Sequence, residues 1–329
     1  MKSIGILGAG AWGTALAIAA NRAGLDVTLQ AFEHEVANAI NSTQENAMYL
    51  PGVKLDSHIK ATTDIAQTVQ ADVVILVPPA QFLRNICEAA KPHWKTGTPV
   101  IICAKGVEQE TFALLSEVVE QILGDVAPIS VLSGPTFAIE VAKDMPTALT
   151  LACQDEALGQ QLCKALSSRC FRPYYSNDIT GAQLGGAVKN VLAIACGIVE
   201  GKGLGDNARA ALITRGLAEI ARLGTVLGAD EHTLMGLSGL GDLTLTCNAM
   251  QSRNFSLGYA LGQGRSLTDI LKDRKSVTEG VFTAAAVTAL ARRHQVDMPI
   301  CLAVDAILNL NADLESVIAG LLRRPLNIE

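Results

Sequence analysis

The chain has 329 residues, of which 49% are hydrophobic, 18% charged and 4% aromatic. This length favours two domains, and the apolar fraction is ample for a large core. The net charge of −6 argues against a nucleic-acid-binding protein, which would normally carry a basic face, but it does not exclude a phosphorylated substrate.

The eight cysteines are scattered, and no two of them form a C-x-x-C pair. This spacing favours free thiols in a reducing cytosol over disulfides or a zinc site, so it predicts a cytoplasmic protein without a metal. The N-terminus lacks the basic region and cleavage site of a signal peptide. The most apolar later stretch, residues 191–199, is about half as long as a bilayer span, and we expect no membrane span.

Apolar runs with many β-branched residues alternate with helix-length segments over the first half of the chain. They predict strands at residues 4–7, 27–32, 72–77, 99–103 and 129–132, with a helix at 11–23 after the first strand. Two more strands, at 148–152 and 171–175, extend the sheet. Apolar strands that alternate with helices indicate a parallel sheet covered on both faces, whose default arrangement is doubly wound.

The pattern changes near residue 180, where Ala, Leu and Gly begin to recur at helical spacings. Helices are predicted at residues 182–200, 208–227, 256–262 and 282–294, with two shorter ones near the end. The predicted fold is therefore α/β, with an N-terminal doubly wound Rossmann-type domain followed by a mostly α-helical C-terminal domain. We expect residues 1–180 to bind a dinucleotide and residues 181–329 to bind substrate and carry catalysis.

The first predicted strand runs directly into a Gly-x-Gly-x-x-Gly motif, Gly8-Ala9-Gly10-Ala11-Trp12-Gly13. Gly8 permits a tight turn, Gly10 lets the backbone approach a pyrophosphate, and Gly13 lets the helix pack closely on the strand. The free N–H groups and the dipole of the helix attract the anion. A merely structural turn is the alternative, but the strand before the motif and the helix after it are the context that dinucleotide binding requires.

Either NAD or NADP fits this motif. An acidic residue that would hold the ribose 2′-hydroxyl is expected about 20 residues after the motif, and Glu33 lies there. Glu33 also opens the next predicted helix, whose N-terminus it would favour in any case. No arginine lies between Gln30 and Val36 to bind a 2′-phosphate. The residues lean towards NAD and leave NADP open.

Lys189 is the only charged residue between Asp178 and Glu200. Its helical neighbours one turn away, Gly185 and Ala193, are too small to screen it. Burial among apolar groups would lower the pKa of this lysine towards the range useful for acid–base catalysis. The alternative is a lysine that reaches the surface from an apolar helix, and the residues alone do not decide between the two.

Other polar candidates lie in Gly-rich or apolar surroundings. Lys105 and the segment 133–136 follow strands, at the carboxyl edge of the sheet where ligands bind. Asp242 is an isolated carboxylate that could pair with a lysine, and the segment 252–254, Ser-Arg-Asn, suits a phosphate. A solvated loop for Lys105, a helix cap for Asp242 and a surface charge for Arg253 are the alternatives. No histidine has a nucleophile or metal-ligand context.

Taken in order, these segments resemble the NAD(P)-dependent glycerol-3-phosphate dehydrogenase family. The resemblance runs from residue 4 to about residue 285. The matching segments are residues 8–13, 105–106, 133–138, 184–192, 205–207, 209–215, 239–247, 252–254 and 277–280. A generic dinucleotide-binding protein would share only the first of them.

The resemblance implies an NAD(P)-dependent oxidoreductase that interconverts dihydroxyacetone phosphate and sn-glycerol 3-phosphate. It further implies a cytoplasmic homodimer that supplies glycerophospholipid synthesis. By the same resemblance, the catalytic residues are Lys189, the general acid/base, with Asp242 and Lys105. The implied substrate-binding residues are Lys105, Gly134, Thr136, Lys189, Asn190, Asp242, Thr246, Ser252, Arg253 and Asn254. The implied cofactor-binding residues are Gly8, Gly10, Ala11, Trp12, Gly13, Phe32, Lys105, Ala138, Arg253, Val277 and Glu279.

Three departures from the family pattern occur. Gln30 stands where many relatives have Trp, Pro79 replaces a common Ser, and residues 31–33 lack the Arg or His often found there. The last departure weakens the expectation of NADP. Two alternatives remain: a related two-domain hydroxyacid dehydrogenase, which would prefer a carboxylate to a phosphate, and a non-catalytic dinucleotide sensor.

Overall fold

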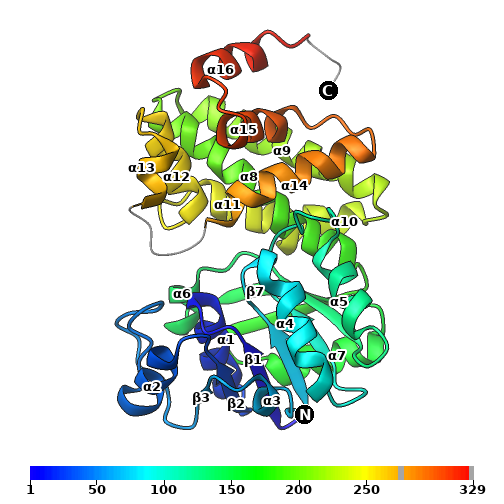
Figure 1. Cartoon of the computed structure of the whole chain (residues 1–329). Coiled ribbons are helices and arrows are strands. Elements are labelled where there is room, and N and C mark those ends of the chain that lie inside the picture. Colours follow the sequence, from blue (N-terminus) through cyan, green and yellow to red (C-terminus); the bar gives the residue numbers. More distant parts are fainter. Residues whose placement is uncertain (273–277, 326–329) are drawn as a thin grey trace. The chain divides into compact units, whose positions relative to one another are not determined.

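The computed structural model describes residues 1–272 and 278–325. The chain separates into two compact units (Figure 1). The first consists of Met1–Lys105 with Ala113–Gln183, and the second of Gly106–Phe112 with Leu184–Glu329. A sheet with helices on it forms the first unit, and helices form the second. The predicted α/β class with a helical C-terminal part is confirmed.

One sheet organises the first unit, with strand order β3-β2-β1-β4-β5-β6-β7-β8. The strands are β1 (Ser3–Leu7), β2 (Asp26–Gln30), β3 (Lys60–Thr62), β4 (Val73–Leu76), β5 (Val100–Ile102), β6 (Ile129–Ser133), β7 (Thr147–Cys153) and β8 (Phe171–Ser176). The six strands β1 to β6 are parallel and have the doubly wound order 3-2-1-4-5-6. Such a sheet binds ligands where the order reverses, which here is between β1 and β4.

The last two strands differ from the predicted parallel arrangement. β7 runs antiparallel to β6, with Ser130 opposite Cys153 and Ser133 opposite Thr150, whereas β8 is parallel to β7. The link between β6 and β7 contains only the five-residue helix α6 (Ala138–Ala142). The chain therefore turns back beside β6 instead of crossing the sheet on a long helix, as a parallel connection would require. The three-residue edge strand β3 was not predicted.

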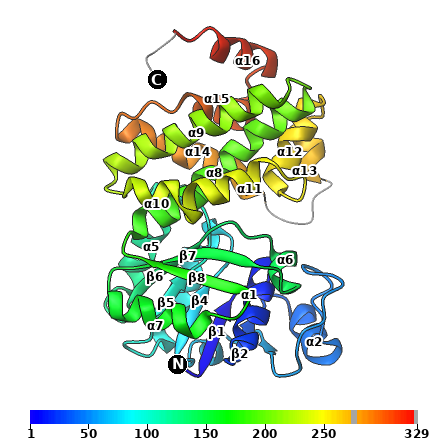
Figure 2. The same ribbon diagram turned by 180° about the vertical axis from the view of Figure 1, so that it is seen from behind.

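Helices cover both faces of this sheet, as the two opposite views show (Figures 1 and 2). On one face, α1 (Ala11–Arg22), α2 (His34–Thr43) and α7 (Glu156–Leu166) contribute buried side chains to one core cluster. On the other face, α4 (Leu83–Ala90) and α5 (Leu115–Leu123) contribute to a second. The shorter helices are α3 (Ile65–Thr68), η1 (Ala80–Phe82) and η2 (Lys91–His93).

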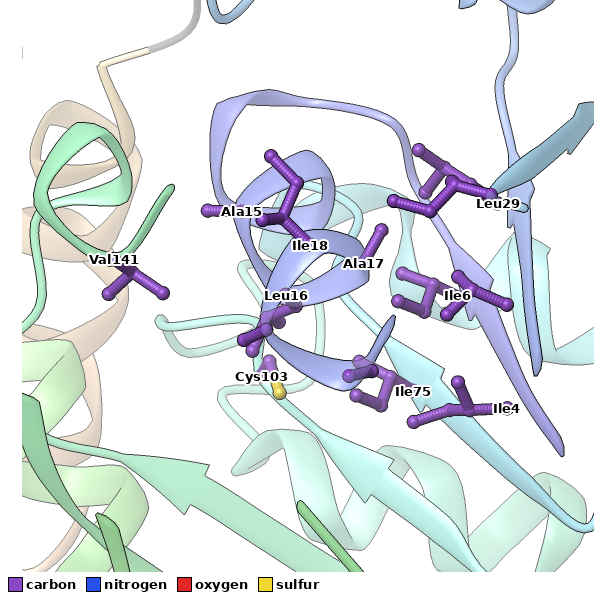
Figure 3. Close-up of a cluster of buried hydrophobic side chains, with 14 of the residues drawn as sticks. Ile4, Ile6, Ala15, Leu16, Ala17, Ile18, Leu29, Ile75, Cys103 and Val141 are labelled. Atoms are coloured by element: carbon purple, nitrogen blue, oxygen red, sulfur yellow. The ribbon is translucent and has the colours of Figure 1, made fainter. Parts of the chain in front are cut away.

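Helix α1 is held against the centre of the sheet by apolar packing. Figure 3 shows Leu16 and Ala17 of α1 beside Ile6 of β1 and Ile75 of β4. All four side chains are buried. Each buried leucine or isoleucine side chain contributes roughly 1.5–3 kcal/mol of hydrophobic stabilisation. The packing holds the start of α1 at the carboxyl end of β1.

The second unit is built on α8 (Ile179–Gly201), which begins at the end of the first unit. The helices that follow are α9 (Asp206–Val226), α10 (Glu231–Met235), the π-helical turn η3 (Leu237–Gly241), α11 (Asp242–Cys247), α12 (Arg253–Gly262), α13 (Leu267–Lys272), α14 (Glu279–Arg293), α15 (Pro299–Asn309) and α16 (Leu314–Leu322). The four longer helices predicted for this region correspond to α8, α9, α12 and α14. Helix α8 is long and apolar enough to cross a membrane, but its most apolar window is completely buried, as in the core helix of a soluble protein.

A buried carboxylate joins two helices of this unit. Glu219 of α9 is 1% exposed, and its side chain accepts hydrogen bonds from the backbone N–H of Ile300 at 2.6 Å and of Cys301 at 3.1 Å. These are donors at the N-terminus of α15, where a helix has no internal acceptors for its N–H groups. Burial raises the pKa of Glu219, although the two backbone hydrogen bonds oppose the shift.

The raised pKa of Glu219 predicts a pH-dependent stability. The native state binds the Glu219 proton more tightly than the unfolded state, so the free energy of unfolding falls as the pH rises from about 4.3, the unfolded value, towards the native pKa. Urea unfolding across this range should show this decline in the wild type and a smaller decline in Glu219→Gln. An identical pH dependence in both proteins would contradict the assignment. Glu219→Ala should lose about 2–4 kcal/mol of stability at low pH, where Glu219 contributes most, because two buried N–H groups lose their acceptor.

Candidate active site

Close packing of glycines brings a short π-helical segment onto α8. A Cβ atom at Gly185 would lie 2.4 Å from the carbonyl oxygen of Ser238, so only glycine allows this approach. Gly185 lies one helical turn before Lys189, and Ser238 lies one turn before Asp242. The contact therefore places the two charged side chains opposite each other.

Lys189 is paired and buried. Its Nζ donates to Asp242 Oδ1 at 2.5 Å and to Thr246 Oγ1 at 2.9 Å. The exposed fractions are 6% for Lys189, 0% for Asp242 and 4% for Thr246. The Thr246 hydroxyl donates to the backbone oxygen of Asp242 at 2.6 Å, which turns its lone pairs towards the lysine. Of the two interpretations that the sequence left open for Lys189, the buried lysine is correct.

The carboxylate also sets the charge of the lysine. An opposite charge at hydrogen-bond distance favours the ammonium form, against the desolvation that burial imposes. Burial alone, the effect expected from the sequence, would favour the neutral amine. Cys247 follows Thr246 in the chain, and burial raises the pKa of its thiol well above the usual value. It is therefore a neutral neighbour of the pair.

Asn190, which follows Lys189 in α8, belongs to a cluster of hydrogen-bonded amide groups. Asn254 Nδ2 donates to Asn190 Oδ1 at 2.9 Å, and Asn254 Oδ1 accepts from the backbone N–H of Gly280 at 3.1 Å. Helix α12 approaches α8 so closely that a Cβ at Gly258 would lie 2.0 Å from the carbonyl oxygen of Ile194. The structure thus brings together the predicted residues Asn190 and Asn254.

The rest of this segment begins helix α12. Ser252 is the N-cap, and its Oγ accepts from the backbone N–H of Phe255 at 3.2 Å. Arg253, the first residue of α12, is exposed, whereas Ser252 is 5% exposed. Glu279 begins α14 and is half-buried. Val277 lies outside the described residues.

A second group of predicted residues lies in the first unit, after the carboxyl ends of β5 and β6. Lys105 Nζ donates to the carbonyl oxygen of Gly134 at 3.2 Å, and Thr136 Oγ1 donates to the same oxygen at 3.3 Å. Lys105 is therefore not merely a solvated loop residue. Ala138, which begins α6, is half-buried. Ser133, the first residue of the candidate segment 133–136, precedes this group, and its buried hydroxyl has no hydrogen-bond partner among the described residues.

The Gly8–Gly13 turn has the geometry that a dinucleotide requires. Gly8 has φ +118°, a region that favours glycine, and its amide donates to the Gln30 carbonyl at 3.1 Å. A Cβ at Gly13 would lie 1.8 Å from the Gly8 carbonyl oxygen, whereas a Cβ at Gly10 would meet nothing within 4 Å. The space beside Gly10 and the absence of an acidic residue from the first turn of α1 suit a pyrophosphate.

Two further side chains belong to this region. Trp12 Nε1 is buried without a hydrogen-bond partner among the residues that the structure describes. Phe32, after the end of β2, is 86% exposed. A separate pocket between α2 and β3 is lined by residues that include Ile40, Asn41 and Lys60. Its lining contains none of the predicted site residues.

A Gly-rich turn at the switch point of a doubly wound sheet, with a buried lysine in a helical unit, defines a dinucleotide-dependent dehydrogenase with two units. The chain matches the family models for the N-terminus of NAD-dependent glycerol-3-phosphate dehydrogenase over residues 3–159 and for its C-terminus over residues 178–319. The chain belongs to the NAD-dependent glycerol-3-phosphate dehydrogenase family. This membership confirms the predicted class, an NAD(P)-dependent oxidoreductase.

Individual relatives agree over almost the whole chain. The chain is 59% identical to the glycerol-3-phosphate dehydrogenase, NAD(P)+, of Rhodospirillum rubrum, over 99% of this chain and 93% of that protein. It is 56% identical to the protein of the same name from Caulobacter vibrioides, over 100% of this chain and 99% of that protein. The crystal structure of glycerol-3-phosphate dehydrogenase from Coxiella burnetii is similar with a TM-score of 0.94 and 39% identity, over 98% of this chain and 99% of that one.

The glycine geometry predicts different effects at two neighbouring positions. Gly10→Ala should leave the free energy of unfolding within about 0.5 kcal/mol of wild type, because its Cβ meets nothing. The methyl group would instead occupy the space for the pyrophosphate and weaken NADH binding by about tenfold or more. Gly13→Ala should lose about 1–3 kcal/mol of stability through overpacking. Thermal unfolding and fluorescence titration with NADH measure both quantities, and wild-type NADH affinity in Gly10→Ala would contradict the assignment.

Proposed function

We propose that this chain reduces dihydroxyacetone phosphate to sn-glycerol 3-phosphate reversibly, with Lys189 as the general acid/base. The observation that carries this proposal is the buried Lys189–Asp242 pair in a family of glycerol-3-phosphate dehydrogenases. We further propose that residues 1–180 bind the dinucleotide and that residues 181–329 bind the substrate and supply the proton.

The proton step follows from the charge of the lysine. Bound NADH or NADPH supplies the hydride that C2 of the substrate receives. As the C=O double bond at C2 becomes a single bond and negative charge develops on the oxygen, the ammonium of Lys189 donates a proton to this oxygen, which becomes a hydroxyl group. In the oxidative direction, the neutral amine takes this proton back. Asp242 and Thr246 hold Nζ through two hydrogen bonds, which keeps the acid in one orientation.

Substrate orientation is assigned to the residues next to the lysine. Arg253 would bind the phosphate, because a guanidinium offers paired donors to phosphate oxygens. Ser252 and Asn254 would bind it beside Arg253, and Asn254 would also hold Asn190 through their 2.9 Å hydrogen bond. Substrate contacts are also proposed for Gly134, Thr136 and Lys105. Binding energy from the phosphate then serves to orient C2.

The dinucleotide would occupy the Gly8–Gly13 turn. The backbone at Gly10 and Ala11 would receive the pyrophosphate. Trp12 Nε1, which is buried without a hydrogen-bond partner among the described residues, would donate to an acceptor atom of the ligand, and this bond would offset the cost of burying the N–H group. Cofactor contacts are further proposed for Phe32, Lys105, Ala138, Arg253 and Glu279, and for Val277, which the structure does not describe. In the cell we propose a cytoplasmic homodimer that supplies glycerophospholipid synthesis.

The reaction is tested by following the nicotinamide absorbance with purified protein. Dihydroxyacetone phosphate should be reduced with NADH or NADPH, whereas a 2-keto acid that lacks a phosphate should react at least about a hundredfold more slowly, because it cannot fill an Arg253 site. Preference for the keto acid would support the hydroxyacid alternative. Cofactor binding without turnover of either substrate would support the sensor alternative.

The role of Lys189 is tested with a neutral side chain of similar length. Lys189→Met should lower kcat by roughly 10²- to 10⁴-fold, the range for loss of a general acid, while the dissociation constant of NADH stays the same. Because one unpaired buried charge costs about 3–5 kcal/mol, Lys189→Met alone should also be less stable. The double variant Lys189→Met/Asp242→Asn removes both charges and serves as the folded control. Turnover by the double variant within about tenfold of wild type would contradict the proposal.

A further inference from the structure

The side chain of Glu33 is held by a tyrosine. Glu33 precedes α2 at the N-cap position, yet it makes no side-chain hydrogen bond to that helix. Its Oε1 instead accepts from the Tyr49 hydroxyl at 2.6 Å. The carboxylate therefore lies at the N-terminus of α2, whose dipole it still favours, but it is oriented by a residue that is distant in sequence.

Tyr49 is in turn connected to the Gly8–Gly13 turn. The buried Asn46 donates through Nδ2 to the Ala9 carbonyl at 2.8 Å and to Thr14 Oγ1 at 2.8 Å. Its Oδ1 accepts from the backbone N–H of Tyr49 at 3.2 Å. An unbroken series of hydrogen bonds thus runs from the Gly8–Gly13 turn through Asn46 and Tyr49 to Glu33. The position of the carboxylate depends on the same turn that receives the pyrophosphate.

The charges around this carboxylate disfavour a second anion. Residues 31–35 are Ala-Phe-Glu-His-Glu, with two carboxylates and no lysine or arginine. The exposed His34 directs its Nδ1 towards Thr63 Oγ1 at 3.5 Å, beside β3. The hydrogen bond to Glu33 raises the pKa of Tyr49 to about 12, so the phenol remains a neutral donor to the carboxylate.

We propose that Glu33, held by Tyr49, makes this enzyme selective for NADH over NADPH. The carboxylate accepts a hydrogen bond from the 2′-hydroxyl of the adenosine ribose, and it repels the 2′-phosphate that NADPH carries at that position. The exposed ring of Phe32 offers the adjacent adenine an apolar surface. Tyr49 is a positioning residue, since it acts only through Glu33. The inference rests on the proposed dinucleotide site.

Direct binding measurements test this selectivity without turnover. Fluorescence titration of the wild type with NADH and with NADPH should give a dissociation constant at least about tenfold larger for NADPH, which corresponds to about 1.4 kcal/mol. Glu33→Gln keeps an acceptor for Tyr49 but loses the charge, so NADPH should bind about tenfold more tightly and the ratio should approach one. Glu35→Gln, which removes an exposed charge two residues away, should leave the ratio unchanged.

Tyr49→Phe separates positioning from a structural role. Loss of the hydroxyl should lower the ratio of the two dissociation constants several-fold. If Tyr49 had only a structural role, Tyr49→Phe would weaken the binding of both cofactors equally, and this result would overturn the assignment of Tyr49. Equal affinity of the wild type for NADH and NADPH would overturn the inference, and so would an equal effect of Glu33→Gln and Glu35→Gln. Failure of the wild type to bind either cofactor would overturn the dinucleotide site itself, and with it this inference.

Discussion

The ion pair between Lys189 and Asp242 is the constraint on which the second unit depends. Two charges that are almost completely removed from water must be paired, because leaving either one alone costs several kcal/mol. The glycine at position 185, the π-helical turn η3 and the start of α11 are all arranged so that the carboxylate reaches the lysine. A buried ion pair is weak evidence for stability, since apolar residues of the same volume would often stabilise the fold as well. The proposed proton transfer explains a buried charged pair at this place better than stability does.

The proposed dinucleotide site of the first unit depends on backbone geometry and not on a charged pair. A pyrophosphate must come close to a helix N-terminus, and side chains would prevent this. The strand order places the β1–α1 turn at the switch point, and Gly8 and Gly13 make the turn tight. The open space at Gly10 is then available to a ligand. The same turn holds Asn46, so the Gly8–Gly13 backbone and the carboxylate at Glu33 are parts of one hydrogen-bonded arrangement.

Local patterns predicted what is local in the structure. The Gly8–Gly13 turn, the apolar strands and the long helices α8 and α9 depend on neighbouring residues and could be predicted from spacing. The absence of other charges near Lys189 in the sequence was a correct signal for its burial, but its partner lies 53 residues away. The residues indicated only that Asp242 could pair with a lysine, and the family resemblance was needed to connect it with Lys189. The direction of β7, the bonds of Glu219 to α15 and the Tyr49–Glu33 contact had no local signature. Each depends on how distant segments pack.

The claim that Lys189 supplies the proton is tested most directly by replacing its amine with a soluble one. Lys189→Ala leaves a space in which a small primary amine can take the place of the side chain. Single-turnover reduction of dihydroxyacetone phosphate should be almost abolished in this variant. It should recover saturably as ethylamine is added, and the recovered rate should vary with the pKa of the amine, as general acid catalysis requires. A Lys189→Ala variant that transfers hydride at the wild-type rate without any amine would contradict the account.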